Sequence, residues 1–424
     1  MDGARGNLLV RHLEEYALYT QPITCLRPAP SRAAQFAAPP YDVFDDASAR
    51  AWLSSHPQSF LAIDLPEATF GPDEHPDAKD LMARARALLD ERTQDGTLTS
   101  DDTPCYYLYR LEQDGTSQTG IVCACAVEDY ENGTILKHES TRREKLAGRI
   151  DHIRALDAQT GLIFLACPDQ SLIDSACEVA SGADPLYDYE EDGVRETVWR
   201  IADPQAVATV QDLLAHIEKA YIADGHHRAA AAVAVAHAAH AEYPDAGELA
   251  SDYFLSILYA SHELRIHAYN RVVSDRAGMT TDELIEAVRR AGCAVEPSEG
   301  PVTPEERHTI GMFSDGSWWT LTAPEPTSPD PASALDVSIL QDRILDPVLG
   351  IADPTRDERI SFVSGVLGTD ELERLAGADG VAFSMHPTSA EELEAVADAG
   401  LLMPPKSTWF APKPRSGLFV RQLA

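Results

Sequence analysis

A short run near the middle of the sequence combines residue types that suit phosphate chemistry. It lies between an apolar stretch and an alanine-rich stretch, residues 229–241, and reads Asp224-Gly225-His226-His227-Arg228. Alanine has the highest helix propensity, so a helix is expected from Ala229, with the run at its N-terminus. Unpaired backbone N–H groups and the positive end of the helix dipole favour anions there. Glycine permits close approach of a ligand, and imidazole and guanidinium groups donate to phosphate oxygens. The run therefore predicts an anion site.

Asp224 is the exception in this run, because it places an anion beside an expected anion site. Its carboxylate could hold the Mg²⁺ that accompanies a nucleotide phosphate, or orient an attacking hydroxyl. It could equally be a helix cap, with Gly225 a turn residue and the histidines incidental. Because His226 and His227 are adjacent, they cannot both face one metal from a helix, which argues against a zinc site.

A second segment carries clustered basic residues in an otherwise acidic chain. A strand is expected to end at about Leu136, and a helix to run from near Thr141 through Arg154. On that helix, Arg142, Lys145 and Arg149 lie three and four residues apart and so share one face. This basic stripe could bind an anion, or it could belong to a surface helix paired with nearby acidic residues. The scarcity of cations in this sequence favours anion binding.

Two proline-stiffened segments could also reach a site. Residues 38–43 read Ala-Pro-Pro-Tyr-Asp-Val, and the double proline forbids helix there. Tyr41 and Asp42 could line a pocket or form a packed corner. Near the end of the chain, Lys406, Ser407 and Thr408 could donate to a phosphate. That closing segment could instead be a strap packed by Trp409 and Phe410.

These segments carry a resemblance to known families. The blocks APPYDV, KHESTR, IADGHHR and MPPKSTWF resemble those of a widespread prokaryotic family known only as a domain of unknown function. That likeness runs nearly end to end. The Asp224–Arg228 run also resembles a signature of the ParB/sulfiredoxin-like fold, which includes free serine kinases that use ADP or ATP. The resemblance implies a ParB/sulfiredoxin-like core with N- and C-terminal additions. In those kinases a glutamate after the first core strand is the base, and Glu139 is the candidate to match it.

The leading hypothesis is nucleotide-dependent phosphoryl transfer to a small hydroxyl substrate, foremost free L-serine. ATP or ADP and Mg²⁺ are the expected cofactors. Glu139 and Asp224 would be catalytic, with Asp224 as the metal ligand. The phosphates would be held by residues of both segments, namely Gly225, His226, His227, Arg228, Arg142, Lys145 and Arg149. The substrate would be bound by Lys137, His138, Thr141, Tyr41, Asp42, Lys406, Ser407 and Thr408.

Two other functions remain open. One is a nucleotide-binding regulator that hydrolyses the nucleotide slowly and takes no small-molecule substrate. The other, a phosphatase or hydrolase, ranks last because no nucleophile is evident. The sequence contains neither a P-loop nor a Gly-x-Gly-x-x-Gly fingerprint.

The amino-acid composition limits the kinds of partner that the protein is expected to bind. The chain has 34 Lys and Arg against 69 Asp and Glu, so its net charge of −35 disfavours nucleic acid and anionic membranes. Residues 1–11 have no apolar signal-peptide core, and no apolar run is long enough to cross a bilayer. Seven scattered cysteines fit a reduced, cytoplasmic protein, with Cys123 and Cys125 on one face of a strand. The oligomeric state stays open.

The pattern of elements predicts an α/β protein with mixed sheets. We expect three regions: an N-terminal one over 1–103, a core with the phosphate site over 104–325, and a C-terminal one over 335–424. Residues 104–128 are expected to form a hairpin whose turn at Asp114-Gly115 is longer than two residues. Residues 60–63 are expected to form a strand, and residues 207–220 a helix that leads into the strand before Asp224.

Overall fold

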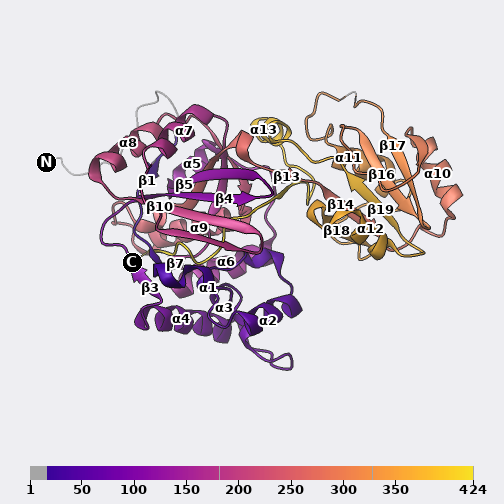
Figure 1. Ribbon diagram of the computed structural model, residues 1–424. Helices are drawn as coiled ribbons and strands as arrows, with labels where there is room; N and C mark the ends of the chain where they lie inside the picture. Colours follow the sequence, from indigo (N-terminus) through magenta and orange to yellow (C-terminus); the bar gives the residue numbers. More distant parts are fainter. Residues whose placement is uncertain (1–16, 181, 327, 424) are drawn as a thin grey trace. The chain divides into compact units, whose positions relative to one another are not determined.

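The computed structural model describes residues 17–180, 182–326 and 328–423 as an α/β protein of two compact units (Figure 1). Of the described residues, unit 1 takes those within 1–136, 141–264 and 412–424, and unit 2 takes those within 137–140 and 265–411. The predicted α/β class with mixed sheets is confirmed. The three predicted regions follow chain order, whereas each compact unit is assembled from separate segments. The stretch 1–11, on which the signal-peptide expectation rests, lies outside the described residues.

Unit 1 is built on a mixed sheet with the strand order β6-β11-β8-β12-β5-β4-β10-β9, and β1 pairs with β5. β11 runs parallel to β6, and β12 runs parallel to β8; the other neighbours are antiparallel. The strands are β1 Thr20–Gln21, β4 Tyr106–Gln113, β5 Thr116–Ala126, β6 Ile135–Leu136, β8 Ile163–Cys167, β9 Tyr187–Glu191, β10 Val194–Ile201, β11 Ala220–Asp224 and β12 Tyr253–Ala260.

The β4–β5 hairpin has a two-residue turn. Gln113 faces Thr116 across it, and both turn residues are left-handed, with φ of 52° at Asp114 and 75° at Gly115. The prediction of a longer turn was therefore wrong. Asp-Gly adopts the left-handed pair of conformations that matches the twist of the flanking strands, so two residues suffice.

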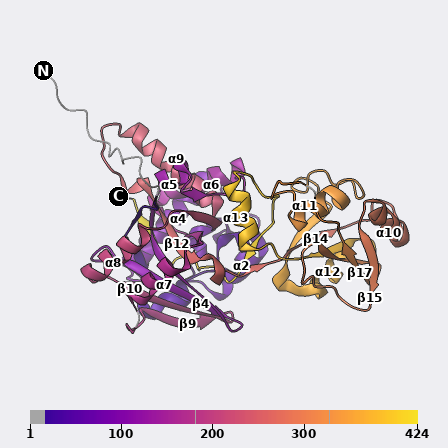
Figure 2. The ribbon, with the colours of Figure 1, turned by 90° about the horizontal axis from the view of Figure 1, so that it is seen from above.

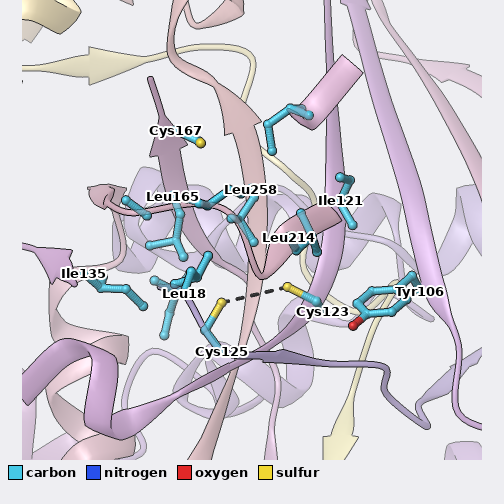
Figure 3. Close-up of a cluster of buried hydrophobic side chains, with 14 of the residues drawn as sticks. Leu18, Tyr106, Ile121, Cys123, Cys125, Ile135, Leu165, Cys167, Leu214 and Leu258 are labelled. Carbon is cyan, nitrogen blue, oxygen red and sulfur yellow. Dashed lines mark hydrogen bonds between the residues drawn. The ribbon is translucent and has the colours of Figure 1, made fainter. Parts of the chain in front are cut away.

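One face of this sheet packs against helices α7 Gln170–Glu178, α8 Pro204–Leu214 and α9 His226–Glu242. Their apolar side chains join those of the strands in one buried cluster (Figure 3). Cys123 and Cys125 both lie in it, with their sulfurs 3.8 Å apart, which confirms that they share a strand face. On the opposite face, Tyr107 contacts Phe419 of the C-terminal segment, with ring centroids 5.0 Å apart.

A second cluster of unit 1 gathers short helices around α4. Helix α5 Val127–Asn132 contributes Val127 to the first cluster. The helices of unit 1 outside the first cluster are α1 Ala33–Phe36, α2 Asp46–Ser55, α3 Leu61–Asp64, α4 Ala78–Gln94 and α6 Arg143–Leu156. Two small sheets pair β2 Leu26–Pro28 with β3 Leu98–Ser100, and β7 Ala158–Gln159 with β21 Arg421–Gln422. α6 and α9 pack side by side (Figures 1 and 2).

Two predicted elements were misassigned or misplaced. Residues 60–63 are not a strand, because Leu61–Asp64 form helix α3. A four-residue apolar run has no periodicity that separates a buried strand from a helical turn. The helix expected over residues 207–220 is α8, Pro204–Leu214, which begins earlier because Asp203 caps it and a proline occupies its first turn.

Gly417 fixes the path of the C-terminal segment over Phe60. Its φ is +88°, and a Cβ there would lie 2.5 Å from Cβ and Cγ of Phe60. We expect Gly417→Ala to lower the free energy of unfolding by about 2–4 kcal/mol, since it adds both backbone strain and a clash. Gly96→Ala is the matched control, because Gly96 has a φ of +77° but nothing within 4 Å of an added Cβ. Urea denaturation gives both values; equal losses would show that the Phe60 contact contributes nothing.

Unit 2 contains a fully antiparallel sheet with the order β15-β17-β16-β19-β14-β18. Its strands are β14 Tyr269–Val273, β15 Ala294–Ser298, β16 Thr309–Ser314, β17 Ser317–Thr322, β18 Ile360–Ser364 and β19 Val381–Met385. Strand β13 Ile266–His267 pairs separately with β20 Trp409–Phe410. The α-helices of this unit are α10 Thr281–Arg290, α11 Asp336–Leu340, α12 Gly368–Ala376 and α13 Ala390–Asp398. Among the residues described, neither unit has a helix of the length and apolarity that crossing a bilayer requires.

Candidate functional site

The candidate site of unit 1 is built around the start of helix α9. Strand β11 ends at Asp224, Gly225 turns the chain with a φ of 93°, and α9 begins at His226. The helix thus starts three residues before the predicted Ala229, because left-handed Gly225 reverses the chain directly after the strand. Gly225 occupies the N-cap position, so Asp224 is not the cap. His226, His227 and Arg228 form the first turn, whose N–H groups suit an anion.

Arg228 is held in a fixed position by neighbouring backbone. Its Nη1 donates to the carbonyl of Leu162 at 2.8 Å. Gly161 makes room for it, since a Cβ there would lie 3.0 Å from Nε of Arg228. The guanidinium carbon lies 5.3 Å from the ring centroid of Tyr41. The charged group therefore has a single defined place beside the first turn of α9.

Arg149 of helix α6 meets the same tyrosine. Its guanidinium carbon lies 4.0 Å from the ring centroid of Tyr41. Nη2 donates to the backbone carbonyl of Asp64 at 3.3 Å, and Nη1 lies 3.8 Å from the Asp64 carboxylate. The hydroxyl of Thr160 donates to that carboxylate at 3.0 Å. Two arginines from separate helices are thus brought to one aromatic ring.

Lys413 bridges two carboxylates from distant parts of the chain. Its Nζ lies 2.9 Å from Oδ2 of Asp42 and 3.2 Å from Oδ2 of Asp224. The lysine side chain is 11% exposed, and those of Asp42 and Asp224 are 34% and 29% exposed. The chain is held there because Ala38 and Ser416 exchange two backbone hydrogen bonds, of 3.1 and 2.8 Å. The 38–43 loop and the C-terminal segment therefore meet at the end of β11.

The electrostatics of this bridge favour its ionised form. Burial by itself would raise the pKa of Asp42, but the charges of Lys413 and Arg228 outweigh it and lower that pKa to about 2. Burial likewise opposes a charged Lys413, yet Asp224 and Asp42 raise its pKa above the usual value. The ammonium of Lys413 and the carboxylate of Asp42 are therefore charged at neutral pH.

The structure brings part of the predicted stripe to the start of α9. The backbone N–H of Arg142 donates to Nε2 of His227 at 3.0 Å. Arg142 thus contacts the first turn of α9 through its backbone; its side chain is exposed, and it lies just before α6, which begins at Arg143 rather than near Thr141. Lys145 is exposed on α6, and Thr141 is half-buried just before that helix. The partner of Arg149 is Asp64 of α3 rather than an acidic residue of its own helix.

The other predicted residues belong to unit 2, and their roles stay predictions. Lys137, His138 and Glu139 form part of the short segment 137–140. His138 is buried, and its backbone carbonyl accepts a hydrogen bond of 2.8 Å from the N–H of Met403.

The closing segment of unit 2 packs locally. Nζ of Lys406 lies 5.3 Å from the ring centroid of Tyr269, and the ring of Trp409 lies 5.4 Å from it. The hydroxyl of buried Ser407 donates to the carbonyl of Pro404 at 2.6 Å, and Thr408 is half-buried. These contacts favour the packed-strap interpretation.

The sequence did not identify four residues that shape the unit 1 site, namely Asp64, Thr160, Gly161 and Lys413. Lys413 gave one signal, because it is one of few lysines in a very acidic chain. Asp64 was hidden by the misassigned strand over residues 60–63. Thr160 and Gly161 lie in an ordinary loop between β7 and β8, and only the contacts with Asp64 and Arg228 distinguish them.

Comparison with known proteins gives a family and a distant fold likeness. Residues 20–338 match a family described as a protein of unknown function (DUF1015). No curated protein matches the chain. Among solved structures, SbnI with a C-terminal truncation, from Staphylococcus aureus, is 14% identical, with a TM-score of 0.37 over 71% of this chain and 87% of that one.

Free serine kinases are among the other similar structures. One in complex with AMP is 12% identical with a TM-score of 0.34, and a mutant in complex with ADP is 12% identical with a TM-score of 0.33. Each of the two matches covers 69% of this chain and 87% of the kinase chain. The resemblance to a family of unknown function is thus confirmed, and a distant similarity to nucleotide-bound proteins is found.

Proposed function

This chain belongs to DUF1015, a family of proteins of unknown function, and we propose that its unit 1 binds a nucleotide by its phosphates at the start of α9 and transfers a phosphoryl group to a small hydroxyl substrate. The leading candidate substrate is free L-serine, with ATP or ADP as donor. One observation carries the proposal: Arg228 and Arg149 converge on Tyr41 directly beside the first turn of α9.

The mixture of positive and negative side chains at the site favours Mg²⁺ with a nucleotide as the ligand over an anion alone. Three cations (Arg149, Arg228 and Lys413) lie against three carboxylates, those of Asp42, Asp64 and Asp224. A site for an anion alone gains nothing from the carboxylates. A nucleotide with Mg²⁺ needs both signs, because carboxylate oxygens are good magnesium ligands while guanidinium and N–H groups neutralise phosphates. Phosphoryl transfer depends mainly on such positioning and charge neutralisation.

In this proposal the predicted catalytic and phosphate-binding residues keep defined tasks. Asp224 holds Mg²⁺, and the first turn of α9 with Arg228 holds phosphate oxygens. Arg142, Lys145 and Arg149 neutralise the remaining charge. Glu139 remains the candidate proton acceptor, on the resemblance to serine kinases alone. A nucleotide-binding regulator without a substrate is the alternative.

The direct test is an assay for O-phosphoserine. Purified protein is incubated with ATP or ADP, Mg²⁺ and L-serine, and the product is followed by ³¹P NMR. We expect product only when nucleotide, Mg²⁺ and serine are all present. Asp224→Asn should lower the rate by about 100-fold or more, because it weakens charge-based metal binding. Asp188→Asn is the control, since Asp188 lies on the exposed edge strand β9 and pairs with Arg195.

The other outcomes separate the alternatives. Slow nucleotide hydrolysis that is independent of serine and of other small alcohols would favour the regulator. Absence of both turnover and nucleotide binding, in protein shown to be folded by circular dichroism, would overturn the proposal.

A further inference from the structure

A small cavity lies between α6, α9 and strand β12, and its lining includes both arginines of the proposed phosphate site. Its volume is about 30 Å³. One wall is polar and is formed by Arg149, His152, Gln159, Thr160 and Arg228. The apolar wall is formed by Ile153, Ile163, Ala232, Phe254 and Leu255. Every lining residue belongs to unit 1.

The charge of the polar wall comes from its two arginines. Each guanidinium has five N–H donors, and the contacts to Leu162 and Asp64 engage only part of them. The Asp64 carboxylate offsets one of the two positive charges. The charges of Asp42 and Asp224 also act on Arg228, but the residues that line the cavity include none of these three carboxylates. Forked cationic donors therefore face the cavity, which suits a small anion.

His152 adds no charge at neutral pH. Its burial, and next the charge of Arg149, lower its pKa to about 4. Nε2 of His152 lies 2.9 Å from the carbonyl of Ile63, so the neutral ring donates there and keeps its lone pair on Nδ1. The histidine therefore positions the backbone before Asp64 and leaves anion binding to the arginines.

The size of the cavity limits what it can hold. A water molecule needs roughly 10–15 Å³ of such volume, so the space takes roughly two or three waters. A carboxylate attached to a short carbon chain fits, whereas a nucleobase is too large. A phosphate would turn some of its oxygens toward Ile153, Ile163 and Phe254, and burying charged oxygens against apolar groups is costly. A carboxylate can instead point both oxygens at the arginines and its carbon at the apolar wall.

We propose that this cavity holds the carboxylate end of the substrate whose hydroxyl is phosphorylated. The substrate class is then a short hydroxy acid or hydroxy amino acid, and amino alcohols or sugars are excluded. Arg149 and Arg228 receive the carboxylate, and Ala232 and Phe254 limit the length of the chain. This inference rests on the proposed phosphoryl transfer for the role of the ligand as a substrate.

Calorimetric titration of the full-length protein tests the inference. The probes are L-serine, 3-hydroxypropionate and L-serinamide, each added with and without ADP and Mg²⁺. We expect both acids to bind, and the amide, which keeps the shape but loses the negative charge, to bind at least about tenfold more weakly. Ala232→Val fills the cavity and should weaken acid binding at least about tenfold while ADP binding stays unchanged. Ala238→Val, a half-buried position further along α9, is the matched control.

Each other result has a defined meaning. The inference is overturned if the amide binds as tightly as the acid, if neither acid binds at millimolar concentration, or if Ala232→Val abolishes binding of inorganic phosphate but not of serine. Should Ala232→Val fail to fold, the acid–amide comparison in the unaltered protein decides. Charge-dependent acid binding that Ala232→Val removes, without any phosphoserine formation, would support the cavity assignment and count against the proposed transfer. Normal ADP binding without acid binding would overturn the cavity assignment alone.

Discussion

Lys413→Met is expected to lower the free energy of unfolding at pH 7 by about 2 kcal/mol. Removal of the ammonium leaves the carboxylates of Asp42 and Asp224 facing one another without their shared cation. Breaking a fully buried pair costs about 3–5 kcal/mol, whereas exposed pairs contribute up to about 1 kcal/mol. The carboxylates here are about one-third exposed, so an intermediate value follows. Urea denaturation measures it, with Lys79→Met on the exposed face of α4 as the control.

The same variant should change the response to acid. The pKa of Asp42 is lowered to about 2 in the folded protein, against about 4 in the unfolded chain. A lowered carboxyl pKa stabilises the fold above the unfolded value, and this stabilisation is lost as pH falls from about 4 to about 2. The difference between the unaltered protein and Lys413→Met should therefore shrink over that window. Adding Asp42→Asn to Lys413→Met should restore part of the stability at pH 7. If Lys413→Met is no less stable than Lys79→Met, the bridge has no structural importance.

Arg228→Gln is expected to weaken ADP binding by about 10- to 100-fold. A charge-assisted hydrogen bond contributes about 1.5–3 kcal/mol, and each 1.4 kcal/mol corresponds to a tenfold change in Kd. Glutamine removes the charge and cannot present two parallel N–H groups to a phosphate. Arg228→Lys should recover only part of the affinity, because it restores the charge without the planar fork. Isothermal titration with ADP and Mg²⁺ gives the values.

Arg195→Gln provides the matched control, since Arg195 is exposed on β10 and pairs with Asp188. Urea denaturation of both variants shows whether the loss of affinity comes from unfolding, because Arg228 also donates to the carbonyl of Leu162. Unchanged ADP affinity in a folded Arg228→Gln variant would contradict the placement of the phosphates at the start of α9.

Local sequence patterns predicted the elements on which the site depends. The strand before Asp224, the alanine-rich helix after it and the helix carrying Arg149 were all expected, because propensity and spacing act within a few residues. The errors fell where local patterns are ambiguous. The segment that became α3 is too short for its apolar residues to reveal a period, and the first turn of α9 depended on the left-handed conformation of Gly225.

The sequence by itself determined that the chain is an acidic α/β protein with an Asp-Gly-His-His-Arg run between a strand and a helix. Only the tertiary structure decided which distant residues complete that site. Lys413 reaches Asp42 and Asp224, and Tyr41 lies against both Arg149 and Arg228. The physical reason is that helix and strand preferences are fixed by neighbours along the chain. A salt bridge or an aromatic contact, by contrast, depends on packing that joins segments hundreds of residues apart.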